Sequence, residues 1–173
     1  MEYKDTLNLP KTDFPMKANL PNREPDILKS WARHSIFQKA LDQSKQSKKY
    51  VLHDGPPYAN GDIHIGHAVN KILKDFIIKS KIMSGYHTPF TPGWDCHGLP
   101  IELQVEKKYG KGKFKDNPNA FVAACREFAN KQIEKQKADF IRLGVFADWD
   151  NPYTSMDKEV EAGIVKSLSK IID

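Results

Sequence analysis

The chain has 173 residues, of which 39% are hydrophobic and 28% charged, with a formal net charge of +5 at pH 7 and two cysteines. This composition is typical of a globular protein and excludes a disordered chain or a disulfide framework. No apolar run reaches the roughly 18 residues that a membrane-spanning helix requires, and no signal peptide is visible, so we expect a cytoplasmic protein with no membrane partner. The mild basic charge is compatible with RNA as a partner, but equally with an ordinary surface.

Residues 1–48 are expected to form an extended arm followed by a helix. Three prolines interrupt the arm, which shows no sustained apolar period. Pro25 and Asp26 then begin a helix, whose apolar residues between Ile27 and Leu41 recur at helical spacing. A basic linker follows.

Residues 49–173 are expected to form an α/β domain that starts with a β–α–β unit. Residues 50–52 read as a short buried strand, Asp62 as the cap of the next helix, and Gly85 as its end. Residues 90–92 lead to residues 93–95, which read as the end of a second strand. This order predicts a parallel sheet with ligands at the carboxyl ends of its strands. The helix between the strands is predicted to bury an apolar stripe and to solvate its lysines; the stripe comprises Ile65, Val69, Ile72, Leu73, Phe76, Ile77 and Met83.

Three further helices are predicted in the rest of the chain. A short one covers residues 102–109. A long one begins with Asn117 as its N-cap and Pro118 at its first position, and ends near Leu143. Its predicted buried stripe comprises Phe121, Cys125, Phe128, Ile133 and Phe140. Residues 149–153 read as a loop, and residues 156–172 as an amphipathic helix.

The segment before the first crossover helix has the composition of a phosphate site. Residues 55–61 read Gly-Pro-Pro-Tyr-Ala-Asn-Gly, and His64 and His67 follow at a spacing that places them on one helix face. Gly66 leaves room for a phosphate or a flat ring to approach the backbone. Free N–H groups at a helix N-terminus and two imidazoles can stabilise the charge that develops when the α-phosphorus of a triphosphate is attacked. An isolated His-x-x-His pair is more often simple polar capping, and the preceding loop is what favours the phosphate site.

Asp95 follows an aromatic residue at the presumed end of the second strand and could hold a cationic substrate group through a charge-assisted hydrogen bond. It could equally be an ordinary turn aspartate. Tyr58 could pack or serve as a ligand platform, and Gly55 and Pro56 are turn formers or the wall of an apolar pocket.

A zinc site is the alternative chemistry for this region. His64, His67, Cys96 and His97 are all possible ligands. We disfavour zinc, because the adjacent Cys96 and His97 point in different directions and no second ligand pair lies at a finger-like spacing.

Residues 56–67, Pro-Pro-Tyr-Ala-Asn-Gly-Asp-Ile-His-Ile-Gly-His, resemble the His-Ile-Gly-His signature of the class I aminoacyl-tRNA synthetases. The residues around it, residues 92–102 and the arm motifs at 6–10 and 14–16 resemble the isoleucine-specific branch of bacterial type rather than its valine or leucine relatives. The resemblance runs from about residue 5 to the end of the chain. It implies that residues 49–173 form the first half of a Rossmann-like catalytic domain.

The resemblance also implies a reaction and a set of site residues. The family activates its amino acid, isoleucine in this branch, with ATP and Mg²⁺, and then transfers it to its tRNA. By motif position, His64 and His67 would be the catalytic pair. The ATP contacts would be Asn60, Gly61, His64, Gly66 and His67. The amino acid contacts would be Gly55, Pro56, Tyr58 and Asp95, with Asp95 on the α-ammonium group.

Members of this family are several times longer than 173 residues. The resemblance implies an editing domain, a second catalytic half with a Lys-Met-Ser-Lys-Ser-type loop, an anticodon-binding domain and often a zinc module. We find no signature of these, since Lys81-Ile82-Met83-Ser84 lacks the final lysine, and we predict no zinc site in these residues. We therefore expect the N-terminal part of a synthetase, inactive alone and with exposed apolar faces. The alternatives are a non-catalytic RNA-binding or interaction fragment, and a small nucleotidyltransferase with the same histidine signature.

Overall fold

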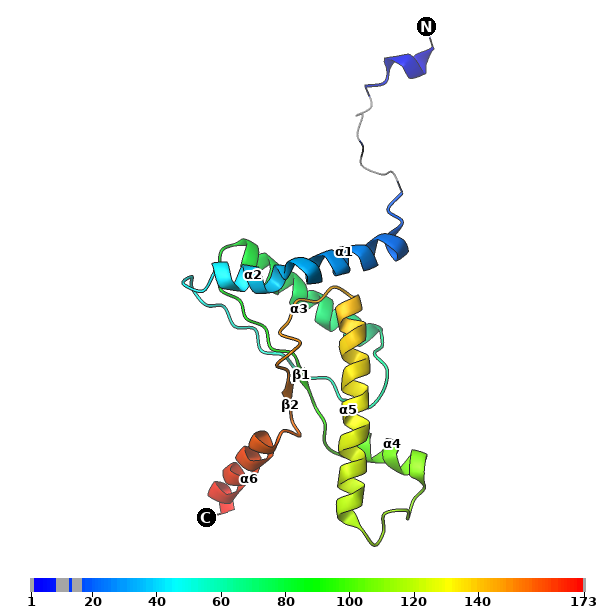
Figure 1. The fold of residues 1–173 in the computed structure, drawn as a ribbon, viewed down its shortest axis with the longest axis vertical. Helices are drawn as coiled ribbons and strands as arrows, with labels where there is room; N and C mark the ends of the chain where they lie inside the picture. The colour runs from blue at the N-terminus through cyan, green and yellow to red at the C-terminus, as the bar shows by residue number, and fades with distance from the viewer. Residues whose placement is uncertain (1, 9–12, 14–16, 173) are drawn as a thin grey trace. The chain divides into compact units, whose positions relative to one another are not determined.

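The computed structural model describes residues 2–8, 13 and 17–172, and the chain divides into two compact units, Met1–His34 and Ser35–Asp173 (Figure 1). The first unit holds the short 3₁₀ helix η1 (Tyr3–Thr6) and helix α1 (Leu20–His34). Helix α1 begins before the predicted start and carries Pro25 in its interior. Residues 1, 9–12 and 14–16 of the predicted arm, including its motif at residues 14–16, lie outside the described residues.

The second unit begins with helix α2 (Ile36–Gln43). The prediction of one helix across residues 27–41 was wrong, because Ser35 adopts the left-handed conformation with φ 49° and ψ 47° and so separates α1 from α2. The units divide after His34, whereas the sequence predicted a boundary after residue 48. That residues 49–173 form half of a catalytic domain stays a prediction.

The sheet of the second unit is small and parallel. Strand β1 (Gly93–Trp94) pairs in parallel with β2 (Tyr153–Thr154). The parallel sense confirms the expected fold class, but Tyr153 was predicted to lie in a loop and no strand was predicted at β2. Residues 50–52 are extended without being a strand, and Val51 is 66% exposed rather than buried.

Two isolated parallel bridges take the place of the predicted first strand. They join Lys49 to His87 and Tyr58 to Asp95. The second bridge sets the Gly/Pro-rich loop against the end of β1, where a parallel sheet binds its ligands.

Helix α3 (Ile65–Met83) lies in the sequence between the Gly/Pro-rich loop and strand β1. It ends as predicted before Gly85, whose φ of +82° favours glycine. Its predicted buried face was wrong: Phe76 is 63% exposed, and the buried residues of the helix are Lys71, Asp75 and Ile78. The two charged residues can occupy the interior because each has an oppositely charged partner there.

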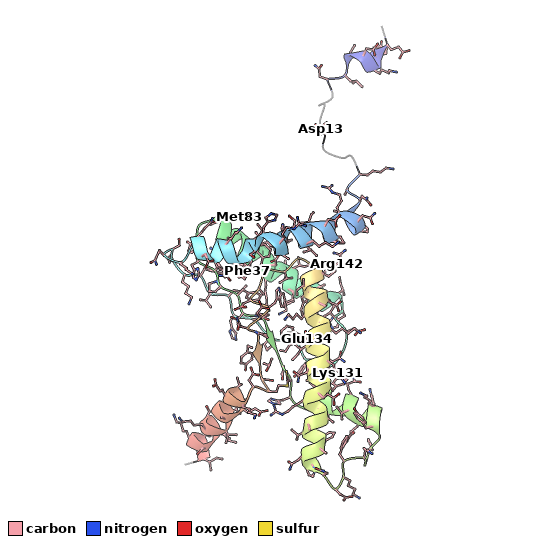
Figure 2. The ribbon with its side chains drawn as sticks, in the orientation of Figure 1. Asp13, Phe37, Met83, Lys131, Glu134 and Arg142 are labelled. Carbon is pink, nitrogen blue, oxygen red and sulfur yellow. The ribbon has the colours of Figure 1, made fainter. Side chains whose placement is uncertain are left out.

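Helices α4 (Leu99–Tyr109) and α5 (Pro118–Arg142) pack against each other, and Figure 1 shows α4 beside the first half of α5. Asn117 caps α5 as predicted, with its side-chain oxygen 3.0 Å from the Ala120 nitrogen. Lys131, Glu134 and Arg142 mark the course of α5 in Figure 2. The buried side of α5 comprises Ala129, Ile133, Gln136 and Phe140, while Phe121, Cys125 and Phe128 are only half-buried.

The main hydrophobic core lies between β1 and α5. It comprises Ala59, Trp94, Cys96, Ala129, Ile133, Phe140 and Met156. Helix α6 (Lys158–Ile172) ends the described chain and has no buried residue. None of the described helices is both long and apolar enough to cross a bilayer.

Candidate functional site

The N-terminus of α3 is closed by its own two histidines. His64, rather than the predicted Asp62, is the N-cap, and its Nδ1 accepts the Gly66 N–H at 3.1 Å. The His64 N–H donates in turn to Nδ1 of His67 at 3.2 Å. The two ring centroids are 3.9 Å apart. This reciprocal capping fixes both rings at the end of the helix where the backbone N–H groups concentrate.

Gly66 lies against the His64 ring. A Cβ at this position would lie 2.9 Å from Cε1 of His64, so a side chain here would force the ring out of its capping position. The sequence suggested that residue 66 is a glycine so that a ligand can approach the backbone. The structure shows a second reason, which is the close approach of the His64 ring. Asp62, which does not cap, pairs instead with Lys135 of α5.

The capping bonds leave the other nitrogen of each ring as the donor. Since both Nδ1 atoms accept a backbone N–H, both neutral rings carry their proton on Nε2. The pKa of His67 lies below its ordinary value, because partial burial disfavours the cation and the nearby His64 and Lys71 disfavour it further. His67 is thus a neutral N–H donor at pH 7.

A cavity of about 300 Å³ opens at this helix end. Its lining comprises Gly55, Pro57, His64, Gly66, His67, Asn70 and Lys71. The structure therefore brings together four predicted site residues, Gly55, His64, Gly66 and His67. Pro56 is not among them: its Cβ would lie 3.4 Å from a Cβ at Gly93, so it packs toward β1.

The predicted residues Asn60 and Gly61 lie in the loop rather than in the cavity lining. Their loop is held by Gln136 of α5, whose Nε2 donates to the Gly61 carbonyl at 2.7 Å and to the Tyr58 carbonyl at 3.0 Å. Oε1 of Gln136 accepts the indole N–H of Trp94 at 3.0 Å. Gln136 was not predicted from the sequence, although an amide in line with the apolar stripe of a helix was a usable signal.

Asp95 lies beside this loop at the end of β1. Its backbone N–H donates to the Pro57 carbonyl at 2.8 Å, and its carbonyl accepts from the Ala59 N–H at 2.9 Å. One carboxylate oxygen, Oδ1, accepts from the His97 N–H at 3.2 Å and from the Ser155 hydroxyl at 3.4 Å. Among the described residues Oδ2 has no hydrogen bond, so it can receive a donor from a ligand. Tyr58, paired with Asp95 through the backbone, has a 47% exposed side chain.

A buried ionic cluster lies behind the cavity and was not predicted. The Asp54 side chain, 3% exposed, pairs with Lys71 and with Lys74, the latter at 2.6 Å. It also accepts the Gly93 N–H at 3.0 Å. Burial lowers the pKa of Lys71 although Asp54 opposes the shift. The lysines were predicted to be solvated, which was wrong.

The predicted zinc alternative has no cluster to support it among the described residues, since no three His, Cys, Asp or Glu side chains lie close enough to hold a metal ion. His97 instead pairs with Glu161 at 2.9 Å, and Glu161 also pairs with Arg126 at 2.5 Å. Cys96 and Cys125 are free thiols. Burial raises the pKa of both.

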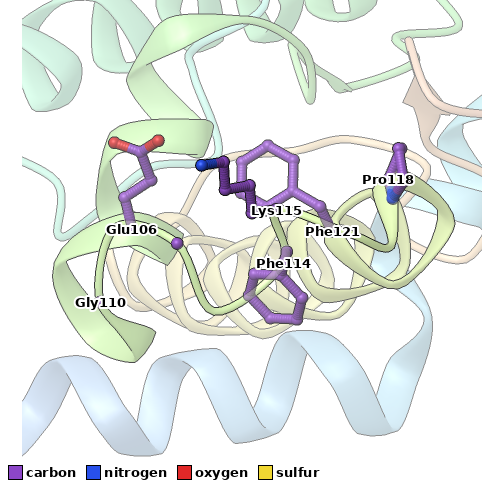
Figure 3. A pocket seen from close by; sticks show the side chains of 7 residues that line it. Glu106, Gly110, Phe114, Lys115, Pro118 and Phe121 are labelled. Atoms are coloured by element: carbon purple, nitrogen blue, oxygen red, sulfur yellow. The ribbon is translucent and has the colours of Figure 1, made fainter.

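A second cavity, of about 390 Å³, lies where α4 ends and α5 begins (Figure 3). Its lining comprises Glu106, Gly110, Gly112, Phe114, Lys115, Pro118 and Phe121. None of these residues belongs to the predicted site.

Comparison with known proteins identifies the class. Residues 26–173 match the family described as tRNA synthetases class I (I, L, M and V), so the chain belongs to this family. Among curated relatives, the chain is 63% identical over 172 residues to the isoleucine–tRNA ligases of Shewanella piezotolerans and Shewanella pealeana. It is 58% identical over 171 residues to that of Haemophilus ducreyi. These matches cover 99% of this chain but only 18% of each relative.

A solved structure supports the fold. It is the ternary complex of the Agrobacterium radiobacter K84 agnB2 LeuRS with tRNA and LeuAMS, with a TM-score of 0.69 at 24% identity. The match covers 89% of this chain and 18% of the other. The resemblance read from the histidine signature is thereby confirmed at the level of family and fold.

Proposed function

We propose that this chain forms the ATP- and isoleucine-binding part of an isoleucine–tRNA ligase. That enzyme would join isoleucine to ATP, releasing pyrophosphate, and then transfer the isoleucyl group to its tRNA. The identity with curated isoleucine–tRNA ligases supports the amino acid. The observation that carries the chemistry is the pair of neighbouring imidazoles at the N-terminus of α3, beside a cavity of about 300 Å³.

The proposed role of His64 and His67 is electrostatic. A carboxylate oxygen of isoleucine attacks the α-phosphorus of ATP, and the bond to the departing pyrophosphate breaks. Negative charge then develops on the oxygens of the α-phosphate, where two Nε2–H donors and the helix dipole stabilise it. Because neither ring forms a bond to phosphorus, both can keep their capping contacts throughout. Mg²⁺ would arrive with ATP and neutralise its phosphates.

The remaining predicted residues are proposed to surround the same reaction. Asn60 and Gly61 would border the nucleotide through their loop, and the backbone of Gly66 would face its phosphates. Asp95 would hold the α-ammonium group of isoleucine through its unused Oδ2. Gly55, Pro56 and Tyr58 would bound the isoleucine side chain. The proposed location is the cytoplasm, where ATP, isoleucine and tRNA occur together.

Isoleucine-dependent exchange of labelled pyrophosphate into ATP tests this proposal. In a ligase of the relatives' full length that contains this chain, we expect His64→Ala and His67→Ala each to slow exchange by about 10²–10³-fold, the range for loss of one transition-state donor. His34→Ala, on α1, is the control and should exchange normally. The 173-residue chain alone should show little or no exchange. Exchange that depends on another amino acid, or that survives loss of both rings, would overturn the assignment.

A further inference from the structure

Asp54 contacts three segments whose relative positions matter for the proposed reaction. Its carboxylate is buried and bonded on every side: Oδ2 to Lys71 and to the Gly93 N–H, Oδ1 to Lys74. Asp54 itself directly precedes Gly55 of the cavity lining. One side chain therefore links the loop, helix α3 and strand β1.

The proposed site has two half-sites: the nucleotide half-site at His64 and His67, and the amino-acid half-site at Asp95. The residues that contact Asp54 lie close in sequence to both half-sites. Lys71 follows His67 by four residues and lies on the same face of α3. Gly93 begins β1, and Asp95 directly follows this strand, two residues after Gly93. Asp54 therefore connects the first turns of α3, which carry the two histidines, to strand β1, which Asp95 directly follows.

The energetics make this link stiff. Two ammonium groups and one carboxylate are withdrawn from water here, with Lys71 and Asp54 each 3% exposed. A rotation or shift of α3 that broke one pair would leave a buried charge without its partner, which is strongly unfavourable. Helix α3 therefore cannot move relative to β1 without disrupting the cluster.

We propose that Asp54 is a positioning residue that sets the distance between the nucleotide-binding helix end and the amino-acid-binding strand. The inference rests on the proposed function for the identity of the two half-sites. Its consequence is specific: a ligand that spans both half-sites depends on Asp54, and a ligand that occupies only one does not.

Helix α3 offers a matched control. Asp75 is also buried, pairs with Lys79 at 2.5 Å and accepts a backbone N–H, that of Phe146, at 2.8 Å. Asp75 lies on α3 itself, whereas Asp54 lies in the loop before this helix, and the contacts of Asp75 lead away from the cavity. Asp54→Asn and Asp75→Asn each remove a buried carboxylate that pairs with lysine and accepts a backbone N–H, and only Asp54 lies between the half-sites.

Amide hydrogen exchange tests the link without any ligand. The reporters are the Gly93 amide and the Ala68 amide, which donates to the His64 carbonyl at 3.1 Å in the first turn of α3. In Asp54→Asn both should lose protection together, by tenfold or more, because one carboxylate holds both segments. In Asp75→Asn the Phe146 amide should lose protection while Gly93 and Ala68 keep theirs. Loss at Gly93 alone would show that Asp54 acts locally and would overturn the proposal.

Binding measurements on the same variants supply the second readout. The probes are ATP, isoleucine and a non-hydrolysable isoleucyl-adenylate analogue. Asp54→Asn should weaken the analogue at least tenfold and ATP or isoleucine alone less than twofold. Equal weakening of all three, or none, would contradict positioning. If the Asp54→Asn variant fails to fold, Asp54→Glu is the second variant, because it keeps the charge and lengthens the side chain. We expect Asp54→Glu to lower the affinity for the analogue at least threefold and to leave the affinities for ATP and isoleucine unchanged.

The two proposals fail separately. A wild-type chain that binds none of the probes would contradict binding by this chain alone, while the exchange pattern would still decide whether Asp54 links α3 to β1.

Discussion

Each histidine of the pair serves folding with one nitrogen and is proposed to serve chemistry with the other. The sequence presented capping and phosphate binding as competing explanations of His64 and His67. In the structure the Nδ1 atoms cap α3 and the Nε2 atoms stay available as donors. Because the cap bonds also select the tautomer, the same contacts that stabilise the helix prepare the donors.

The lowered pKa of His67 predicts a pH-dependent stability. Above the ordinary histidine value of about 6.5 neither state is protonated at this ring, and its contribution is complete. As the pH falls below that value, the unfolded state binds a proton before the folded state does, so the free energy of unfolding decreases. Denaturant unfolding at pH 7.5 and pH 5 should show this decrease, and His67→Gln should reduce it. The exposed His34→Gln is the control; an unchanged pH dependence in His67→Gln would refute the prediction.

Gln136 predicts a stability cost for a substitution that preserves volume. Gln136→Leu leaves the indole N–H of Trp94 and the carbonyls of Tyr58 and Gly61 without their partner. We expect the free energy of unfolding to fall by about 2–4 kcal/mol, since unsatisfied buried groups cost about 1–3 kcal/mol each and are partly relieved by relaxation. Gln132→Leu, one turn earlier and half-buried, should change it by less than about 1 kcal/mol. Equal effects of the two would mean that the amide contacts contribute nothing.

At the scale of elements, the sequence predicted what depends on local chemistry. The cap at Asn117 and the end of α3 before Gly85 were readable because each follows from a few adjacent residues. The break between α1 and α2 at Ser35 was not readable, because serine has no particular preference for the left-handed conformation. The burial of α3 failed for a different reason: periodicity sorts apolar from charged residues, and it cannot show that Asp54 and the lysines neutralise each other inside.

The candidate site divides in the same way. His64, His67 and Gly66 form a contiguous motif, and the structure brings them together. Asp54 and Gln136 are single polar residues whose partners lie far along the chain. Their roles depend on tertiary contacts, which no local pattern contains.

Two glycines in different elements predict stability changes of opposite sign. Gly98, the N-cap of α4, has φ 85° and ψ −174°, a conformation that a side chain strains. Gly98→Ala should lower the free energy of unfolding by about 1–3 kcal/mol. Gly163 lies inside α6 with open space around it, and Gly163→Ala should raise it by about 0.5–1 kcal/mol, because alanine favours the helix. Thermal or denaturant unfolding checks both, and the same sign for the two would contradict the backbone argument.

At the scale of the whole molecule, the chain leaves apolar surface uncovered. Several large apolar side chains of α3 and α6 are at least half exposed, among them Leu73 at 55%, Phe76 at 63% and Val165 at 66%. Exposed apolar faces were predicted from the sequence, and the structure confirms them. Exposed apolar side chains of this kind promote association.

This surface predicts that the isolated chain self-associates. Light scattering should show mass increasing with protein concentration, and a dye that binds apolar surface should fluoresce. Leu73→Lys combined with Phe76→Lys should reduce both signals without lowering the unfolding midpoint, because neither side chain is in the core. Ser80→Lys, exposed on the same helix, adds charge without removing apolar area and serves as the control. A strictly monomeric chain with cooperative unfolding would contradict the prediction.

The anchor at Gln136 has a consequence for synthesis of the protein. The loop that begins at Gly55 leaves the ribosome long before the amide that holds it, which is 75 residues beyond Gly61. Until that helix emerges, two carbonyls of the nascent loop lack this donor, and Trp94 of β1 lacks its acceptor. On a ribosome stalled before Gln136 emerges, the N-terminus of α3 with its two capping histidines could form, because its contacts are local. The loop at residues 55–61 could not yet reach its final conformation.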